Sequence, residues 1–193
     1  MVEAKVCRSK HPPNLAPTRL RLILGAASRR ATLLILLAGA FAPAFLPAVA
    51  QDAIAVAVAD FDYRDTSGEA KDQTAQHAAR VAAFGRRLRE ELARQVKYRL
   101  VPLDCAKPLC STTSLGADGL IAAARRAGAR LLVYGGIHKM STLVQWGDVQ
   151  VVDLRQRQSL LSRTFTFRGD SDQAFHRAAG FIGEILAGVT LKP

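Results

Sequence analysis

Residues 53–68, with the sequence AIAVAVADFDYRDTSG, decide the fold of this 193-residue chain. Their first half, Ala53–Ala59, is an unbroken run of small apolar side chains, and the turn-forming residues Asp60–Gly68 follow it. A short apolar run without polar alternation predicts a strand that is buried on both faces of a sheet. The folded part of the chain is therefore expected to begin with a strand in the middle of its sheet.

Downstream of this run, the hydrophobic pattern changes several times between helical and extended spacing. Leu88, Leu92 and Val96 form one stripe of the first helical segment, and its opposite side is charged. Helical spacing covers 73–95, 116–127 and 170–187, and extended spacing covers 98–103, 130–139, 142–154 and 159–167. The sequence thus predicts a single α/β domain with a mixed sheet in the order β-α-β-α-β-β-β-α.

The first fifty residues carry the pattern of an export signal. Seven Lys or Arg residues precede an uncharged run, Ala31–Ala50, which contains LLILL and ends in Ala-Val-Ala. A basic start, a short apolar stretch and an A-x-A end predict a secretory signal peptide over residues 1–50, cleaved before Gln51. An uncleaved membrane anchor is the alternative, since twenty uncharged residues just span a bilayer. Pro43 and Pro47 interrupt that helix and favour cleavage, which predicts a periplasmic domain over residues 51–193.

The route of export follows from details of the same segment. Arg29-Arg30 resembles a twin-arginine signal, but Thr32 stands where that pattern usually has Phe, so general secretion is favoured. No cysteine follows the apolar run, which argues against a lipid anchor. Any membrane contact is therefore expected through the leader, or through weak attraction of a basic surface to anionic lipid.

Export changes what the cysteines predict. The expected mature chain keeps Cys105 and Cys110, in the sequence Cys-Ala-Lys-Pro-Leu-Cys. In an oxidising compartment, an even pair this close predicts a local disulfide, which contributes about 2 kcal/mol. A redox pair would have the spacing Cys-x-x-Cys, and a zinc site would have two further ligands nearby, so neither alternative is favoured.

Three aspartates, Asp60, Asp62 and Asp65, cluster at the exit of the first strand, which is where α/β sheets often bind ligands. A calcium loop starting at Asp60 fails, because Arg64 and Lys71 occupy its fifth and twelfth positions. Loop-forming side chains paired with Arg64 are the simpler interpretation. The sequence predicts no metal site and no cofactor.

Other motifs also have structural explanations. Gly135-Gly136 lies inside an extended segment and predicts a bulge or a close backbone approach. Arg168-Gly169-Asp170 matches an adhesion tripeptide, but a corner glycine and a cap of the last helix at Asp170-Ser171 explain it. The expected mature chain has a net charge of +5, and glutamates alternate with the arginines of the predicted helix over 73–95. Nucleic acid is therefore not an expected partner.

Several of these motifs, in the same order along the chain, resemble a small secreted bacterial family of unknown function, domain of unknown function 2380 or 3280. The resemblance implies no assigned activity or catalytic residues, and a loose association with periplasmic alcohol oxidation. The order of elements is also similar to the amino-terminal domain of TolB and to curli-secretion and penicillin-binding-protein-activator modules. That similarity implies docking in the envelope and concerns the fold alone. The motifs are residues 59–69, the Cys105/Cys110 loop, 127–129, 135–143 and 167–170.

Two functions remain open. The favoured hypothesis is a non-enzymatic binding or assembly module that docks on an envelope protein through a sheet edge, the loop 60–68 and the hairpin around Trp146. The rival is a small hydrolase or ligand-binding protein that uses the aspartates and His138 in a cleft at the strand ends. No catalytic residue is assigned. The candidate binding residues are Asp60, Asp62, Asp65, His138 and Trp146.

Overall fold

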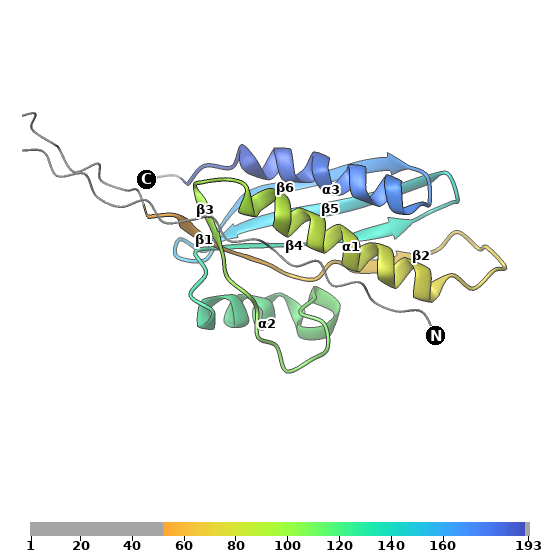
Figure 1. The fold of residues 1–193 in the computed structure, drawn as a ribbon. Coiled ribbons are helices and arrows are strands. Elements are labelled where there is room, and N and C mark those ends of the chain that lie inside the picture. The colour runs from red at the N-terminus through yellow and green to blue at the C-terminus, as the bar shows by residue number, and fades with distance from the viewer. Residues whose placement is uncertain (1–51, 192–193) are drawn as a thin grey trace, which may run out of the picture. The chain divides into compact units, whose positions relative to one another are not determined.

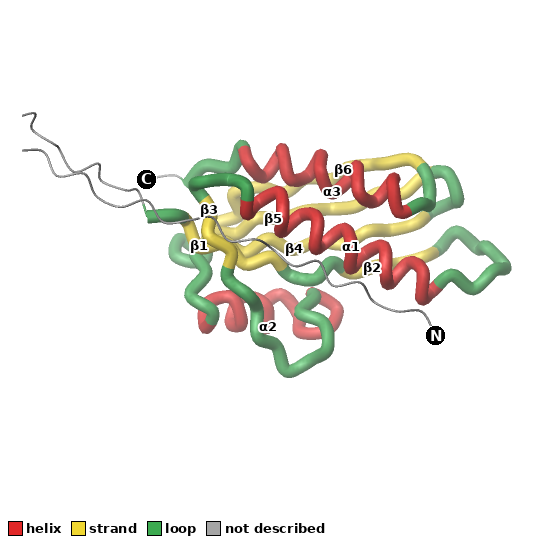
Figure 2. Tube along the Cα trace, viewed as in Figure 1, coloured by secondary structure: helices red, strands yellow, loops and turns green. Residues whose placement is uncertain are grey.

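A computed structural model of the chain describes residues 52–191, and the expected signal peptide lies outside the described residues. These residues form one mixed sheet with helices on both of its faces (Figures 1 and 2). The α/β class and the predicted elements are confirmed, and one short strand is added. The elements are β1 (Ile54–Val58), β2 (Asp62–Asp65), α1 (Thr74–Ala93), β3 (Tyr98–Leu100), α2 (Thr112–Arg126), β4 (Leu131–Lys139), β5 (Val144–Asp153), β6 (Gln158–Arg168) and α3 (Asp172–Ala187).

The strand order is β3-β1-β4-β5-β6, and β2 also pairs with β4. As predicted, β1 is central, since it lies parallel to and between β3 and β4. The strands β4, β5 and β6 form an antiparallel meander. The sheet is therefore parallel at one end and antiparallel at the other.

The strand that sequence reasoning missed is β2, which was expected to be part of a turn. Its residues pair with Gly136–Lys139, on the same edge of β4 that β1 uses at Leu131–Val133. Thus β1 and β2 lie end to end along β4, separated by residues 59–61. The sequence of β2, Asp-Tyr-Arg-Asp, has no apolar run because its last two residues are exposed. The prediction of a loop was wrong at these four residues.

The two faces of the sheet have different packing. Val56 and Val58 of β1 face α1 and α3, which form a cluster rich in large side chains such as Phe84 and Leu88. Ala55 and the other alanines of β1 face α2 in a second, smaller cluster. We call these sides the α1/α3 face and the α2 face. Figure 1 shows α2 under the end of the sheet that holds β1 and β3.

The helix starts show where local signals were misassigned. α2 begins at Thr112, four residues before the predicted start, and Ser111 caps it by accepting a hydrogen bond from the Ser114 N–H. Gly116 then interrupts the helix with a φ of +69°. Of the predicted cap Asp170-Ser171, Ser171 is confirmed, because its side chain accepts a hydrogen bond from the Ala174 N–H at the start of α3. The expected capping role of Asp170 is therefore wrong, and its carboxylate lies among buried cations instead.

Of the two readings of the Gly135-Gly136 pair, the close backbone approach is confirmed. A Cβ at Gly135 would lie 2.0 Å from the Asp148 carbonyl oxygen, so that no other residue fits without moving β5. The register of β4 with β5 continues through both glycines without a bulge. The irregularity of the sheet lies instead between β5 and β6, next to Val151.

Candidate functional site

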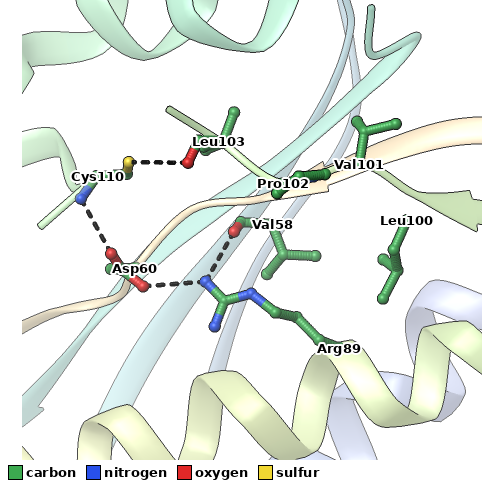
Figure 3. Close-up of a pocket in the computed structure, with 8 residues that line it drawn as sticks. All are labelled: Val58, Asp60, Arg89, Leu100, Val101, Pro102, Leu103 and Cys110. Carbon is green, nitrogen blue, oxygen red and sulfur yellow. Dashed lines mark hydrogen bonds and ion pairs between the residues drawn. The ribbon is translucent and has the colours of Figure 1, made fainter. Parts of the chain in front are cut away.

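The first of the three aspartates, Asp60, ties a loop to the sheet. One of its carboxylate oxygens lies 2.9 Å from Arg89 Nη2, and the other accepts a hydrogen bond from the Cys110 N–H (Figure 3). The Asp60 N–H donates in turn to the Cys110 carbonyl. Cys105 and Cys110 form a disulfide, as predicted, with their Cα atoms 5.7 Å apart. Both oxygens of Asp60 are thus occupied, one by Arg89 of α1 and the other by the disulfide loop.

Asp65 belongs to a group of charges on the α1/α3 face, in which Lys139 and His77 are buried. At its centre, Lys139 Nζ lies 2.6 Å from Glu69 Oε2, 2.8 Å from Asp170 Oδ2 and 3.6 Å from Asp65 Oδ2. His77 Nε2 is 2.8 Å from Asp170, and its Nδ1 is 3.8 Å from Asp65. Arg80 completes the group at 2.7 Å from Asp170. We call this group the ion cluster: Asp65, Glu69, His77, Arg80, Lys139 and Asp170.

Mutual stabilisation of opposite charges governs titration in the ion cluster. Burial by itself would raise the pKa of Asp170, but hydrogen bonds from Lys139 and His77 and the charge of Arg80 lower it to about 2. Burial likewise disfavours a charged Lys139, yet its carboxylate partners raise its pKa above the ordinary value. Lys139, His77 and Arg80 each have a carboxylate partner, so none of them is a free reactive group, and removing one partner of a buried pair is costly.

A cleft of about 670 Å³ opens between α1, the β1–β2 segment and the start of α2. All three predicted aspartates line it, over an apolar base that includes Phe61 and Val81, but His138 does not. Burial, and then the carboxylates of Asp65 and Asp170, raise the pKa of the Tyr63 phenol, which also faces the cleft. The cleft therefore gathers the aspartates without His138, and the histidine that does line it, His77, is already bonded to Asp170.

A second depression brings together the other predicted residues on the α2 face. It measures about 440 Å³, and Asp62, His138 and Trp146 line it together with Asp148 and Arg64. The strand pairing explains this assembly, because Trp146 lies opposite His138 in the β4–β5 ladder, and Asp62 and Asp148 lie on either side of Gly136. We call this depression the Trp146 hollow.

Aromatic packing and hydrogen bonding hold the Trp146 hollow open in a defined form. The rings of His138 and Trp146 pack with their centres 5.3 Å apart, and His138 Nε2 lies 2.6 Å from Thr66 Oγ1. Burial, and then the nearby charge of Asp62, raise the pKa of Asp148. Asp62 also accepts a hydrogen bond from the Thr113 N–H at the start of α2. The hollow thus presents an indole, an imidazole and two carboxylates together.

Sequence reasoning missed Asp148, Lys139 and Asp170. Asp148 follows Trp146 by two residues, so the alternation of strand side chains places both on one face, and that signal was present. Lys139 ends a strand, where a lysine is ordinarily exposed, and its complete burial has no local signal. Among residues 52–191, no three His, Cys, Asp or Glu side chains converge as metal ligands.

The chain belongs to a family. Residues 54–184 match the model of DUF3280, whose description is "Protein of unknown function (DUF2380)". This confirms the resemblance found in the sequence, and with it the statement that the function of the family is unknown. No curated protein sequence matches the chain.

Solved structures with a similar arrangement come from several bacteria. The PelC dodecamer from Paraburkholderia phytofirmans aligns over 73% of this chain and 90% of its own, at 14% identity and a TM-score of 0.47. The C-terminal domain of LpoB from Salmonella enterica aligns over 58% and 81%, at 18% identity and a TM-score of 0.37. TolB from Acinetobacter baumannii aligns over 71% of this chain and 28% of its own, at 14% identity and a TM-score of 0.42.

Proposed function

We propose that this chain is an exported, non-enzymatic binding module of the bacterial envelope, which docks on a periplasmic or envelope protein through the Trp146 hollow. Three features support export: the leader pattern of residues 1–50, the cleavage pattern before Gln51, and the disulfide between Cys105 and Cys110. None of the helices within residues 52–191 is both long and apolar enough to cross a bilayer.

The observation that carries the docking proposal is the convergence of Asp62, His138 and Trp146 in one hollow. These side chains come from three separate strands and lie on the α2 face, whose apolar cluster extends along β4 only as far as Tyr134. An aromatic side chain in a partly open hollow is the kind of residue that dominates protein interfaces. We therefore expect one side chain of a partner to bind in the Trp146 hollow and anchor the complex.

The chemistry of the hollow favours a basic anchor. The carboxylates of Asp62 and Asp148 attract an ammonium or guanidinium group, and the faces of an indole attract the same groups. A cation that binds there would also favour the ionised form of Asp148, whose pKa is raised in the free protein. We expect the partner to insert a lysine or arginine side chain.

The test is recovery of a partner from periplasmic extract with the full chain, expressed with its own leader and a C-terminal tag. A stoichiometric partner is expected with the unaltered chain and with Val96→Ala, which changes an exposed apolar residue in the turn between α1 and β3. It should be lost with Trp146→Ala and weakened at least tenfold with Asp62→Ala or Asp148→Asn. Because Trp146 is the single tryptophan, its emission should also shift when the purified partner is added. Equal recovery by Trp146→Ala, or no partner at all, would contradict the proposal.

Ligand binding in the cleft is the second candidate, and its volume of about 670 Å³ next to three aspartates favours it. Hydrolysis is less well supported, because Asp60 holds Arg89 and Cys110, and Asp65 accepts two hydrogen bonds from Ser67. Both carboxylates are thus already occupied. A small ligand that protects the chain against thermal unfolding equally in Trp146→Ala would favour this candidate over docking.

A further inference from the structure

The outer edge of β6 is free of any strand in the part of the chain that the structure describes. In the sheet order, β6 is the last strand, and it pairs only with β5. It has 11 residues, and its register with β5 is regular over 161–168. An edge strand of this length presents a row of unpaired backbone N–H and C=O groups, which is a template for the addition of another strand.

An apolar depression runs beside this edge, between β6 and α3. It measures about 240 Å³ and lies on the α1/α3 face, so it is separate from the Trp146 hollow. Phe181 lies at its rim and remains 49% exposed, although it is a large apolar side chain. We call this depression the edge groove: Phe165, Phe167, Ala178, Phe181, Arg168 and Arg177 line it.

A strand added to β6 would place every second side chain over the edge groove. Successive side chains of a strand point to opposite faces of the sheet, so residues i and i+2 of the added strand face α3 together. Peptide-binding domains that use strand addition combine these two elements: backbone pairing at a free edge gives affinity, and pockets for alternate side chains give specificity. Here both elements lie side by side.

The charge of this region decides which strand fits. Between Leu154 and Gly169 there are four arginines and no acidic residue. Within residues 52–191, no carboxylate pairs with Arg163, Arg168 or Arg177, and all three are exposed. A second copy of the chain, added through its own β6, would bring these arginines against one another, and like charges across a strand pair are destabilising. An acidic segment meets complementary charge instead.

We infer that the β6 edge and the edge groove form a binding site for an extended acidic segment of another protein, in which apolar residues alternate with Asp or Glu. Main-chain hydrogen bonds form along residues 161–168, and the apolar side chains enter the groove beside Phe181. The carboxylates point to the opposite face of the added strand, where they pair with Arg168. This surface goes beyond the proposed function, because it does not require the Trp146 hollow.

The test measures binding of labelled synthetic peptides to the full chain by fluorescence anisotropy. The probe alternates valine and glutamate over eight residues. One control peptide replaces glutamate with lysine, and a second carries N-methyl groups on alternate amides, which keeps charge and composition but removes backbone pairing. The acidic probe should bind, and both controls should bind at least tenfold more weakly.

Protein variants locate the site. Arg168→Glu and Phe181→Ser alter exposed side chains and should each weaken binding of the acidic probe by about tenfold, the decrease expected for loss of roughly 1.4 kcal/mol. Arg126→Glu, the matched charge reversal on α2, and Trp146→Ala should leave binding unchanged. Circular dichroism should show the same folded spectrum for all four variants.

Three results would overturn the inference. Equal binding of the N-methylated peptide would mean that charge alone attracts the probe, without strand addition. No binding of the acidic probe up to millimolar concentration would also refute it. A concentration-dependent dimer in sedimentation, which Phe181→Ser dissociates, would assign the edge to a second copy of the chain. None of these results bears on a partner that depends on Trp146.

Discussion

His138 and Lys139 are neighbours in β4, and their side chains enter two different surroundings. Lys139 is completely buried in the ion cluster on the α1/α3 face, under two packed helices. His138 lines the Trp146 hollow on the α2 face, beyond the part that the α2 cluster covers. In the same strand, a charged side chain therefore contributes to stability on the face that helices cover. A polar side chain remains accessible to a partner on the face that they do not cover.

The largest loss of stability is expected when the central cation of the ion cluster, Lys139, is removed. Lys139→Met leaves Asp170 and Glu69 buried without their main partner, and loss of one member of a buried ion pair costs about 3–5 kcal/mol. Urea unfolding followed by circular dichroism measures this loss. A change below about 1 kcal/mol would mean that water or Arg80 replaces the lysine.

The second largest effect is expected from acid, which should lower the free energy of unfolding through the ion cluster. The pKa of Asp170 is about 2 in the folded chain and 3.8 when unfolded, so its contribution is complete above about pH 5 and is lost progressively as the pH falls through 2. The loss amounts to about 2.5 kcal/mol. Denaturation midpoints at pH 5, 3 and 2 should show it. In Asp170→Asn the decrease over this range should be smaller, since the group no longer titrates.

Reduction of the disulfide tests the covered part of the α2 face. Cys105→Ser with Cys110→Ser should lower the free energy of unfolding by about 2 kcal/mol, because the loop that it closes is short. Unfolding of the unaltered chain with and without a reductant gives the same quantity independently. If both measurements show no loss, the contacts of Asp60 with Cys110 suffice to hold the loop.

The smallest effect on stability is expected in the Trp146 hollow. Two matched histidine substitutions compare the hollow with the ion cluster directly. His138→Gln should change the free energy of unfolding by less than about 0.5 kcal/mol, since the side chain lines a hollow. His77→Gln should cost about 2 kcal/mol, because it removes a hydrogen bond to a buried carboxylate. Thermal unfolding of the two variants under one condition compares them. Equal losses would contradict the division of the sheet into a stabilising and an available side.

The sequence allowed the fold to be predicted more fully than the site. The Ala53–Ala59 run predicted the central strand, because a strand that is buried on both faces consists of apolar residues without polar alternation. The edge strand β2 left no such mark, since its polar residues are tolerated where one side remains open. Trp146 and His138 were proposed separately, and their pairing required the register of β4 with β5.

The ion cluster was beyond prediction for a different reason. Its members come from β2, the loop after β2, α1, β4 and the corner before α3, and the segments between them contain no spacing that joins them. Asp170 in particular had a sufficient local explanation as a helix cap, and that explanation was wrong. A buried charge is identified by its partners, and partners that are distant in sequence become visible only when the chain is folded.

The position of β1 has a consequence for how the chain acquires its structure. The strand made first needs β4 as its neighbour, about seventy-five residues later, so that the parallel centre of the sheet cannot close until most of the polypeptide has been synthesised. High contact order of this kind slows folding and keeps a nascent chain open. Late closure suits the export that we propose, because a chain that stays open can pass through a narrow translocation channel.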